Sequence, residues 1–303
     1  MINLEKMLDY DIDYLKGSAA FQIAEKYFEI KLYYLAAKEY RKCFEYFYPV
    51  GHCTNRTDAV LKNKEWTEQG DKKVIQAFRE RRVEIDSIVK IIEDRYRQMI
   101  QENVGEAALG LAELLEGLAW RKLNDLSKDE DLELVTETNE EIDTQVLCLL
   151  EQAAALNSKE ALHRLGYIYE NKGDYKKAKD YYAKAVALGC GDSACSIADV
   201  IEKEFISNRG DTYKGSISWL ADMSWGNLVL NEKEKEMLKE AVNWFLIAAS
   251  LGNSTAMSVI SNCYKLGVGI KKNEQLAKHW SSIGEICVGV VKRTQDELLL
   301  IKY

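Results

Sequence analysis

The sequence predicts an all-α protein, a right-handed superhelix (solenoid) of antiparallel helix pairs in which a long helix and insertions interrupt the repeats. Three observations lead to this prediction. The chain of 303 residues contains a single proline, Pro49, so little in it would stop a helix. Alanine, leucine, glutamate and lysine, which favour helices, dominate the composition. Apolar residues recur at helical spacing, and groups of them repeat along the chain.

The clearest unit of this pattern runs from Ala161 to Gly189. Its first helix places Ala161, Leu165 and Tyr169 on one face. Asp174 is expected to cap the second helix, because its carboxylate can accept a hydrogen bond from an unsatisfied backbone N–H. Gly189 suits the left-handed conformation that ends many helices. The expected inner face of the second helix consists of Ala178, Tyr182 and Ala185.

Other segments repeat this arrangement in the same order. In the second helix of a unit, an alanine is followed three residues later by an aromatic residue, at Ala37/Tyr40, Ala178/Tyr181, Ala241/Trp244 and Ala277/Trp280. The first helices repeat an inner-face triplet, at Ala20/Ala24/Phe28, Ala107/Leu111/Leu115, Ala161/Leu165/Tyr169 and Ala256/Ile260/Tyr264. One helix pair cannot bury its apolar faces alone, so neighbouring pairs are expected to stack and form a continuous core.

These residues resemble two repeat families. Leu165-Gly166-x-x-Tyr169 with the inner face of the second helix resembles a tetratricopeptide repeat. The stretch from Tyr264 to Ile270, followed by Ala277-Lys278-His279-Trp280, resembles a Sel1-like repeat, which has a longer turn. The resemblance is strong over residues 142–284 and moderate over 17–48. It implies a solenoid that holds another macromolecule, and a bacterial source.

The repeats and their interruptions divide the chain into four expected segments. Apolar residues over 71–103 have the spacing of one helix, too long for a repeat helix, and residues 205–231 interrupt a repeat unit. The expected segments are an N-terminal helical-repeat unit at 1–51, a long-helix connector at 52–104, a repeat solenoid at 105–284 and a C-terminal capping helix at 285–303. The last would close the solenoid with a polar outer face.

Composition predicts a cytoplasmic protein that binds neither nucleic acid nor membranes. The net charge of −8 disfavours a phosphate backbone and suits a basic partner, although such a charge also serves solubility. The N-terminus lacks a basic stretch followed by an apolar run, and no segment approaches the roughly 20 apolar residues of a membrane helix. Seven cysteines at irregular spacing do not resemble a disulfide framework and fit a reducing compartment.

Residue patterns for chemistry are missing, so we expect no enzyme, no metal and no cofactor. Gly267-Val268-Gly269 lies in a turn between helices and lacks the strand–helix context of a phosphate loop. The three histidines, His52, His163 and His279, are scattered. The sequence contains neither H-E-x-x-H nor C-x-x-C.

The repeat resemblance implies a concave groove lined by first-helix residues that do not pack. The groove candidates are Glu113, Glu116, Glu160, His163, Tyr167, Glu170, Asn171, Asn262 and Lys265, with Glu106, Ser196, Lys203 and Ser258 beside them. Repeat families that clamp a C-terminal carboxylate use a basic set of lysines, arginines and asparagines in the groove, and this mixed set with its acidic bias does not match it. Trp219 and Trp225 in the insertion are a second candidate surface, with a gap-filling role as the alternative. The acidic stretch 125–143 is expected to be a solvated loop or a docking site for a basic surface.

The leading functional hypothesis is a scaffold that binds a protein or peptide partner through its concave surface. One alternative is an immunity or inhibitor protein that neutralises a basic toxin or effector, which the acidity would suit. A second alternative, an enzyme or small-ligand binder, would need a pocket in which His163 lies beside a carboxylate with a shifted pKa.

Overall fold

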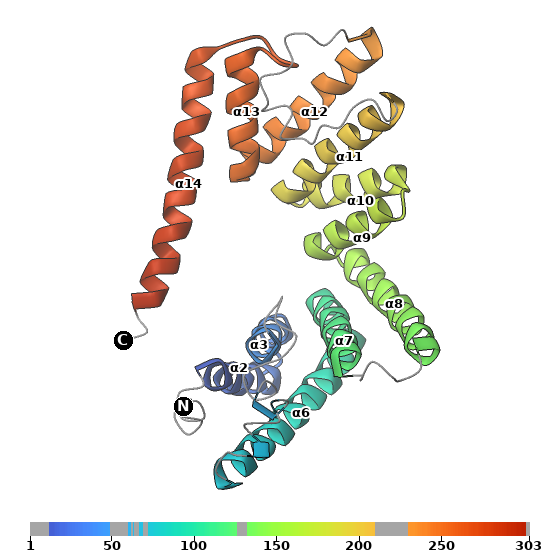
Figure 1. Cartoon of the computed structure of the whole chain (residues 1–303), viewed down its shortest axis with the longest axis vertical. Coiled ribbons are helices and arrows are strands. Elements are labelled where there is room, and N and C mark those ends of the chain that lie inside the picture. Colours follow the sequence, from blue (N-terminus) through green and yellow to red (C-terminus); the bar gives the residue numbers. More distant parts are fainter. Residues whose placement is uncertain are drawn as a thin grey trace. The chain divides into compact units, whose positions relative to one another are not determined.

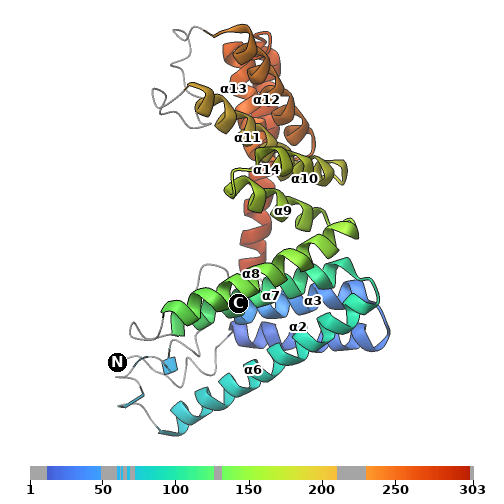
Figure 2. The same ribbon diagram turned by 90° about the vertical axis from the view of Figure 1, so that its right-hand side faces the viewer.

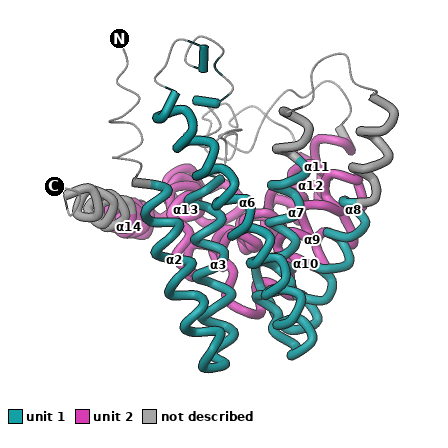
Figure 3. The backbone as a smooth tube through the Cα atoms, turned by 90° about the horizontal axis from the view of Figure 1, so that it is seen from below, with its two compact units in different colours: residues 1–161 teal, residues 162–303 magenta. Residues whose placement is uncertain are grey.

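A computed structural model describes residues 12–48, 60–61, 63, 67–68, 72–125, 132–209 and 230–300 (Figure 1). These residues form helices joined by turns and no strand, which confirms the all-α prediction. The chain divides into two compact units, Met1–Ala161 and Leu162–Tyr303 (Figure 3). This division falls in the first turn of one helix. The four segments expected from the sequence were defined by the type of repeat, whereas the two units are defined by contacts within the fold. The four segments therefore stay a prediction.

Among the residues that the structure describes, the first unit contains five long helices and the second unit contains six. Those of the first unit are α2 (Ile12–Glu29), α3 (Tyr33–Phe47), α6 (Lys72–Gln101), α7 (Gly105–Asp125) and α8 (Leu132–Ala155). The pair α2 and α3 packs against α6 and α7, and the four helices lie side by side (Figure 2). Their shared core includes Tyr40, Phe47, Ile92, Tyr96 and Leu111.

The long helix expected over 71–103 is α6, which has 30 residues. Its buried residues include Phe78, Ile85, Ile92 and Met99 on one face, as an amphipathic helix requires. Helix α6 therefore belongs to the core of the first unit, where its Tyr96 ring packs against α3 and α7.

The six described helices of the second unit are α9 (Lys159–Asn171), α10 (Tyr175–Ala187), α11 (Gly191–Arg209), α12 (Glu232–Ser250), α13 (Ser254–Leu266) and α14 (Glu274–Leu300). Consecutive helices pack against each other from α10 to α14 (Figure 1). The predicted inner face of α10 is confirmed, because Ala178, Tyr182 and Ala185 are all buried. Asp174 caps this helix as expected, since its carboxylate accepts a hydrogen bond of 3.1 Å from the Lys177 backbone N–H.

Close helix approach depends on glycine at two equivalent places. A Cβ atom on Gly166 would lie 2.5 Å from the Tyr182 ring, and one on Gly110 would lie 2.5 Å from the Tyr96 ring. Each glycine therefore lets a buried tyrosine lie flat against a helix backbone.

Two expectations from the sequence meet a different outcome, and a third is not tested. The acidic stretch expected as a loop belongs to helix α8 from Leu132 onward, and residues 126–131 lie outside the described part of the chain. The segment expected as a separate closing helix continues α14 without a break as far as Leu300. Trp219 and Trp225 lie outside the described residues.

Candidate functional site

The first helices of successive pairs in the second unit, α9 and α11, are joined by polar side chains. His163 Nδ1 on α9 lies 2.9 Å from Ser193 Oγ on α11. Seven residues further along α9, Glu170 Oε1 accepts a hydrogen bond of 2.5 Å from Lys203 Nζ on α11. We call the side chains at this junction, His163, Tyr167, Glu170, Ser196, Asp199, Glu202 and Lys203, the α9–α11 face. It brings together groove candidates that the sequence placed on separate helices.

Glu170 is the most heavily bonded residue of this face. It is only 9% exposed. Tyr182 Oη of α10 donates to Glu170 Oε2 at 2.6 Å, and the other carboxylate oxygen accepts from Lys203. A buried carboxylate is stable when both oxygens are bonded and a cation balances its charge. Glu170 therefore ties three helices together.

A carboxylate bonded by a tyrosine and a cation also joins helices in the first unit. This parallel favours a structural role for Glu170. Tyr40 Oη on α3 donates to Glu25 on α2. Arg95 of α6 donates to both oxygens of Glu25, at 3.0 and 2.9 Å. In both units a buried tyrosine of the second helix and a cation of a later helix share one carboxylate of the first helix.

Asp199 and Glu202 have no such arrangement. They lie three residues apart on α11, so their side chains share one side of the helix. Glu202 is 7% exposed, and its Oε1 has no hydrogen-bond partner among the described residues. Burial raises the pKa of Glu202 to about 8 and that of Asp199 to about 6, and the like charges of nearby carboxylates add to both shifts. Lys203 opposes these shifts from its bond with Glu170.

His163 is half-buried, and its ring packs against that of Tyr182 with the centroids 5.3 Å apart. Burial lowers the pKa of His163, while the charges of Asp192 and Glu170 oppose that shift. The imidazole is therefore mainly neutral at pH 7 and serves as a hydrogen-bonding group. Ser193, its partner, is fully buried and donates to Cys190 Sγ at 3.1 Å.

Other groove candidates of the second unit have more access to solvent. Tyr167 on α9 is 57% exposed, and Asn171 at the end of the same helix is exposed. On α13, Asn262 is half-buried and Lys265 is exposed. The turn before α13 joins α11 through Asn253 Nδ2, which donates to Asp192 Oδ1 at 2.7 Å. Tyr167 is thus the large side chain of this face that is most available to a partner.

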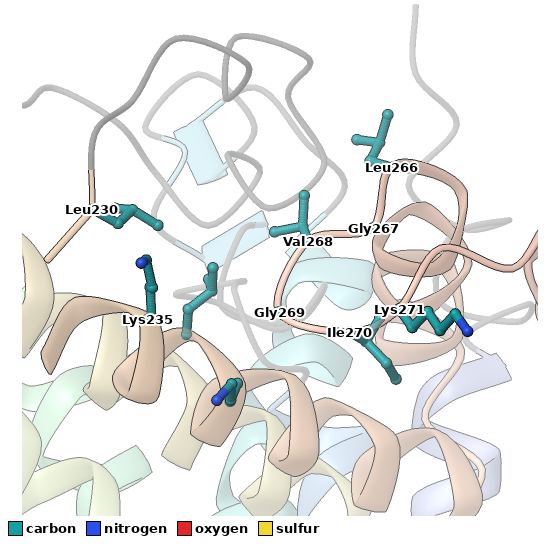
Figure 4. A pocket seen from close by; sticks show the side chains of 10 residues that line it. Leu230, Lys235, Leu266, Gly267, Val268, Gly269, Ile270 and Lys271 are labelled. Atoms are coloured by element: carbon teal, nitrogen blue, oxygen red, sulfur yellow. The ribbon is translucent and has the colours of Figure 1, made fainter. Parts of the chain in front are cut away.

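A separate cavity of about 660 Å³ lies between the start of α12 and the turn that follows α13. Apolar side chains line it together with lysines; the ten residues are Leu230, Lys235, Leu238, Lys239, Leu266, Gly267, Val268, Gly269, Ile270 and Lys271. Figure 4 shows Leu230 and Val268 on opposite sides, with Lys235 rising from α12 between them. The ammonium groups of Lys235 and Lys239 pair with Glu232 and Glu236. The cavity is therefore mainly apolar, and two of its three lysines are paired with carboxylates.

Comparison with known proteins places the repeat in a family. The tetratricopeptide repeat profile matches residues 159–188, which form α9, α10 and the turn between them. Residues 159–188 are therefore a helix pair of the tetratricopeptide-repeat type. Repeat scaffolds of this family generally mediate protein–protein interaction, and the fold is typically non-enzymatic.

Solved structures with related folds are distant from this repeat protein. A Sel1 repeat protein from Oxalobacter formigenes is 17% identical over 64% of this chain and 63% of its own length, with a TM-score of 0.40. The protein c5321, a protective antigen present in uropathogenic Escherichia coli strains and displaying an SLR fold, is 17% identical over 94% of this chain and 79% of its own, with a TM-score of 0.28. No curated protein matches the chain.

The groove candidates of the first unit lie at its internal contacts or on its surface. Glu113 Oε1 on α7 accepts a hydrogen bond from Arg41 Nη2 of α3 at 2.7 Å, and the two side chains form an ion pair. Glu106 lies 3.6 Å from the same arginine, and burial raises its pKa. Glu116 is half-buried and Glu160 is exposed. Arg41 therefore uses the acidic side chains of α7 to join α3 and α7.

Sequence reasoning missed Ser193, Asp199 and Glu202 in this repeat protein. Asp192, Ser196, Asp199 and Lys203 follow one another at intervals of three or four residues, which is the signal that could have shown a polar stripe on α11. No group of three or more metal-ligating side chains occurs among the described residues. None of the described helices is long and apolar enough to cross a membrane.

Proposed function

We propose that this repeat protein is a scaffold that binds a segment of a partner protein along the α9–α11 face. The observation that carries the proposal is the exposure of Tyr167, 57%, on a face whose neighbouring side chains are held by the bonds between α9 and α11. Aromatic side chains presented on a rigid polar surface contribute strongly to binding, because they bury much area at a low cost in side-chain entropy. The proposed role requires no catalysis.

A basic partner, as an inhibitor or immunity protein would have, is the second candidate. The observation that favours it is the excess of carboxylates on α11, where Asp192, Asp199 and Glu202 accompany Lys203. The proposal places the protein in the cytoplasm. There the buried free thiols of Cys43 and Cys263 would stay reduced.

Site-specific cross-linking in lysate of the native host tests the scaffold proposal. A photoreactive phenylalanine analogue replaces Tyr167 in one sample and Tyr34 of α3, which is 55% exposed, in a matched control. We expect position 167 to cross-link to one protein that position 34 does not reach, as read by mass spectrometry. Equal products from the two positions, or none from 167, would contradict the proposal. Loss of the product in 0.5 M salt supports a basic partner, since screening weakens exposed charge pairs.

A further inference from the structure

The acid pair of α11, Asp199 and Glu202, is the part of the α9–α11 face to which no described lysine or arginine is bonded. Glu202 is more than nine-tenths buried, yet its Oε1 has no hydrogen-bond partner among the described residues. The nearest cation, Lys203, is bonded to Glu170 at 2.5 Å. Native structures bond almost all buried polar atoms, so an orphaned carboxyl oxygen calls for an explanation.

Several charged or titratable groups surround this pair. Glu170 of α9 and the Tyr182 hydroxyl of α10 are on one side, and Cys195 and Lys203 belong to α11 itself. Two of these groups, Glu170 and Lys203, balance each other. The remaining pair keeps a proton at neutral pH, because burial raises the pKa of Glu202 to about 8. A cation from outside would replace that proton.

We propose that Asp199 and Glu202 form the anchor for a lysine or arginine side chain of the partner protein. Asp199 is half-buried and borders the exposed part of the face, where a long, flexible basic side chain can reach it. A cation bonded to Asp199 lies within one helical turn of Glu202 and favours its ionised form. Binding then releases the proton that Glu202 held. This anchor rests on the proposed function, since it names the chemistry of the bound segment.

The first measurement is titration calorimetry of the full chain at pH 7 with the blocked peptide Ac-(Lys-Ala)4-NH2. Running it in phosphate and in Tris, which have different ionisation enthalpies, gives the number of protons released. We expect binding with release of up to about one proton per peptide, and no binding of Ac-(Glu-Ala)4-NH2. Failure of the lysine peptide to bind at millimolar concentration, or binding without proton release, would overturn the anchor.

Three variants that each replace one carboxyl group by its amide locate the effect. We expect Asp199→Asn to weaken binding of the lysine peptide about tenfold, and Glu202→Gln to weaken it about threefold and abolish proton release. The control is Glu204→Gln, whose carboxylate pairs with Lys179 at 2.8 Å; binding should stay within about twofold. Equal weakening in all three would mean nonspecific attraction to an acidic protein and overturn the proposal.

The cross-linking result separates failure of the anchor from failure of the scaffold role. If Asp199→Asn and Glu202→Gln bind the lysine peptide like the wild type while position 167 still cross-links to one protein, the face binds a partner without this anchor. Thermal melts of both variants confirm folding. Glu202→Gln should fold normally, because glutamine has nearly the shape of the protonated acid.

Discussion

The pKa of a carboxyl group in this protein is lowered or raised according to whether a cation is bonded to it. Arg95 bonds both oxygens of Glu25 and lowers the pKa of that carboxyl. Glu202 is buried without a bonded cation, and its pKa rises to about 8. In the first case folding stabilises the charge, and in the second it penalises the charge. The two residues therefore make opposite contributions to stability as pH changes.

Glu202 should make the protein less stable as pH rises from about 4.5 to about 8. In this window the folded state holds a proton that the unfolded state has lost, so the free energy of unfolding falls with pH and levels off above pH 8. The expected loss is on the order of 2 kcal/mol. Urea unfolding of the wild type and of Glu202→Gln at pH 5.5 and 8 measures it. The variant should lose distinctly less stability over this window; an equal loss would mean that Glu202 titrates normally.

At the level of residues, the sequence predicted only some of the side chains that lie on the α9–α11 face. It selected His163 and Glu170 through the repeat register, and both lie on the α9–α11 face. It passed over Asp199 and Glu202, because acidic residues at helical spacing are typical of a solvated helix face. Burial of Glu202 depends on packing around α11, which local spacing does not report.

The turns between helices share one hydrogen-bonding pattern. A residue with positive φ ends the preceding helix at Lys31, Asn103, Asn157, Gly173, Gly189 and Gly252. In each case the next residue's N–H bonds to the carbonyl five positions before it, as Leu32 does to Tyr27 at 2.9 Å. Three of these positions are not glycine and carry a steric cost. The repeats therefore conserve turn geometry even where the sequence does not favour it.

Lys31→Gly should stabilise the protein. Lysine at φ of 60° has a Cβ atom in an unfavourable position, and glycine removes that cost while losing some chain entropy. The expected gain is about 0.5–1 kcal/mol in the free energy of unfolding. Asn157→Gly should gain less, because asparagine tolerates this conformation, and Lys31→Ala should gain nothing. Urea unfolding compares the three variants; a gain from Lys31→Ala equal to that from glycine would contradict the turn argument.

At the level of elements, the repeat pattern predicted helix positions better than helix ends and register. The buried aromatic of a second helix follows an alanine by four residues, at Ala36/Tyr40, Ala178/Tyr182 and Ala241/Phe245. The expected spacing of three instead identifies half-buried residues in three helices, at Tyr181, Trp244 and Trp280. An extended helix such as α14 was divided in two, because a repeat length sets no limit on how far helical residues continue.

At the scale of the whole molecule, each compact unit has a large core of its own among the described residues. Each core contains a tyrosine packed on a glycine of another helix, Tyr96 on Gly110 and Tyr182 on Gly166. Repeat proteins unfold as one transition only when the interface energies between neighbouring units are large enough to couple them. Matched glycine substitutions in the two units can therefore measure this coupling.

We expect two thermal transitions, one for each unit. Gly110→Ala should lower the midpoint of the first unit, and Gly166→Ala should lower that of the second. Either added methyl group meets a tyrosine ring at 2.5 Å, an overpacking cost of about 1–3 kcal/mol that exceeds the helix propensity gained. Differential scanning calorimetry should show one transition moving down by about 3–8 °C while the other stays in place. The control is Gly284→Ala in α14. Its new methyl group meets Met257 Cβ at 3.5 Å, which is an ordinary contact. Because alanine favours a helix more than glycine does, this variant should raise the transition temperature of the second unit. A single transition that both Gly110→Ala and Gly166→Ala lower equally would mean that the two cores unfold together, because energy lost in one core is then shared by the whole chain.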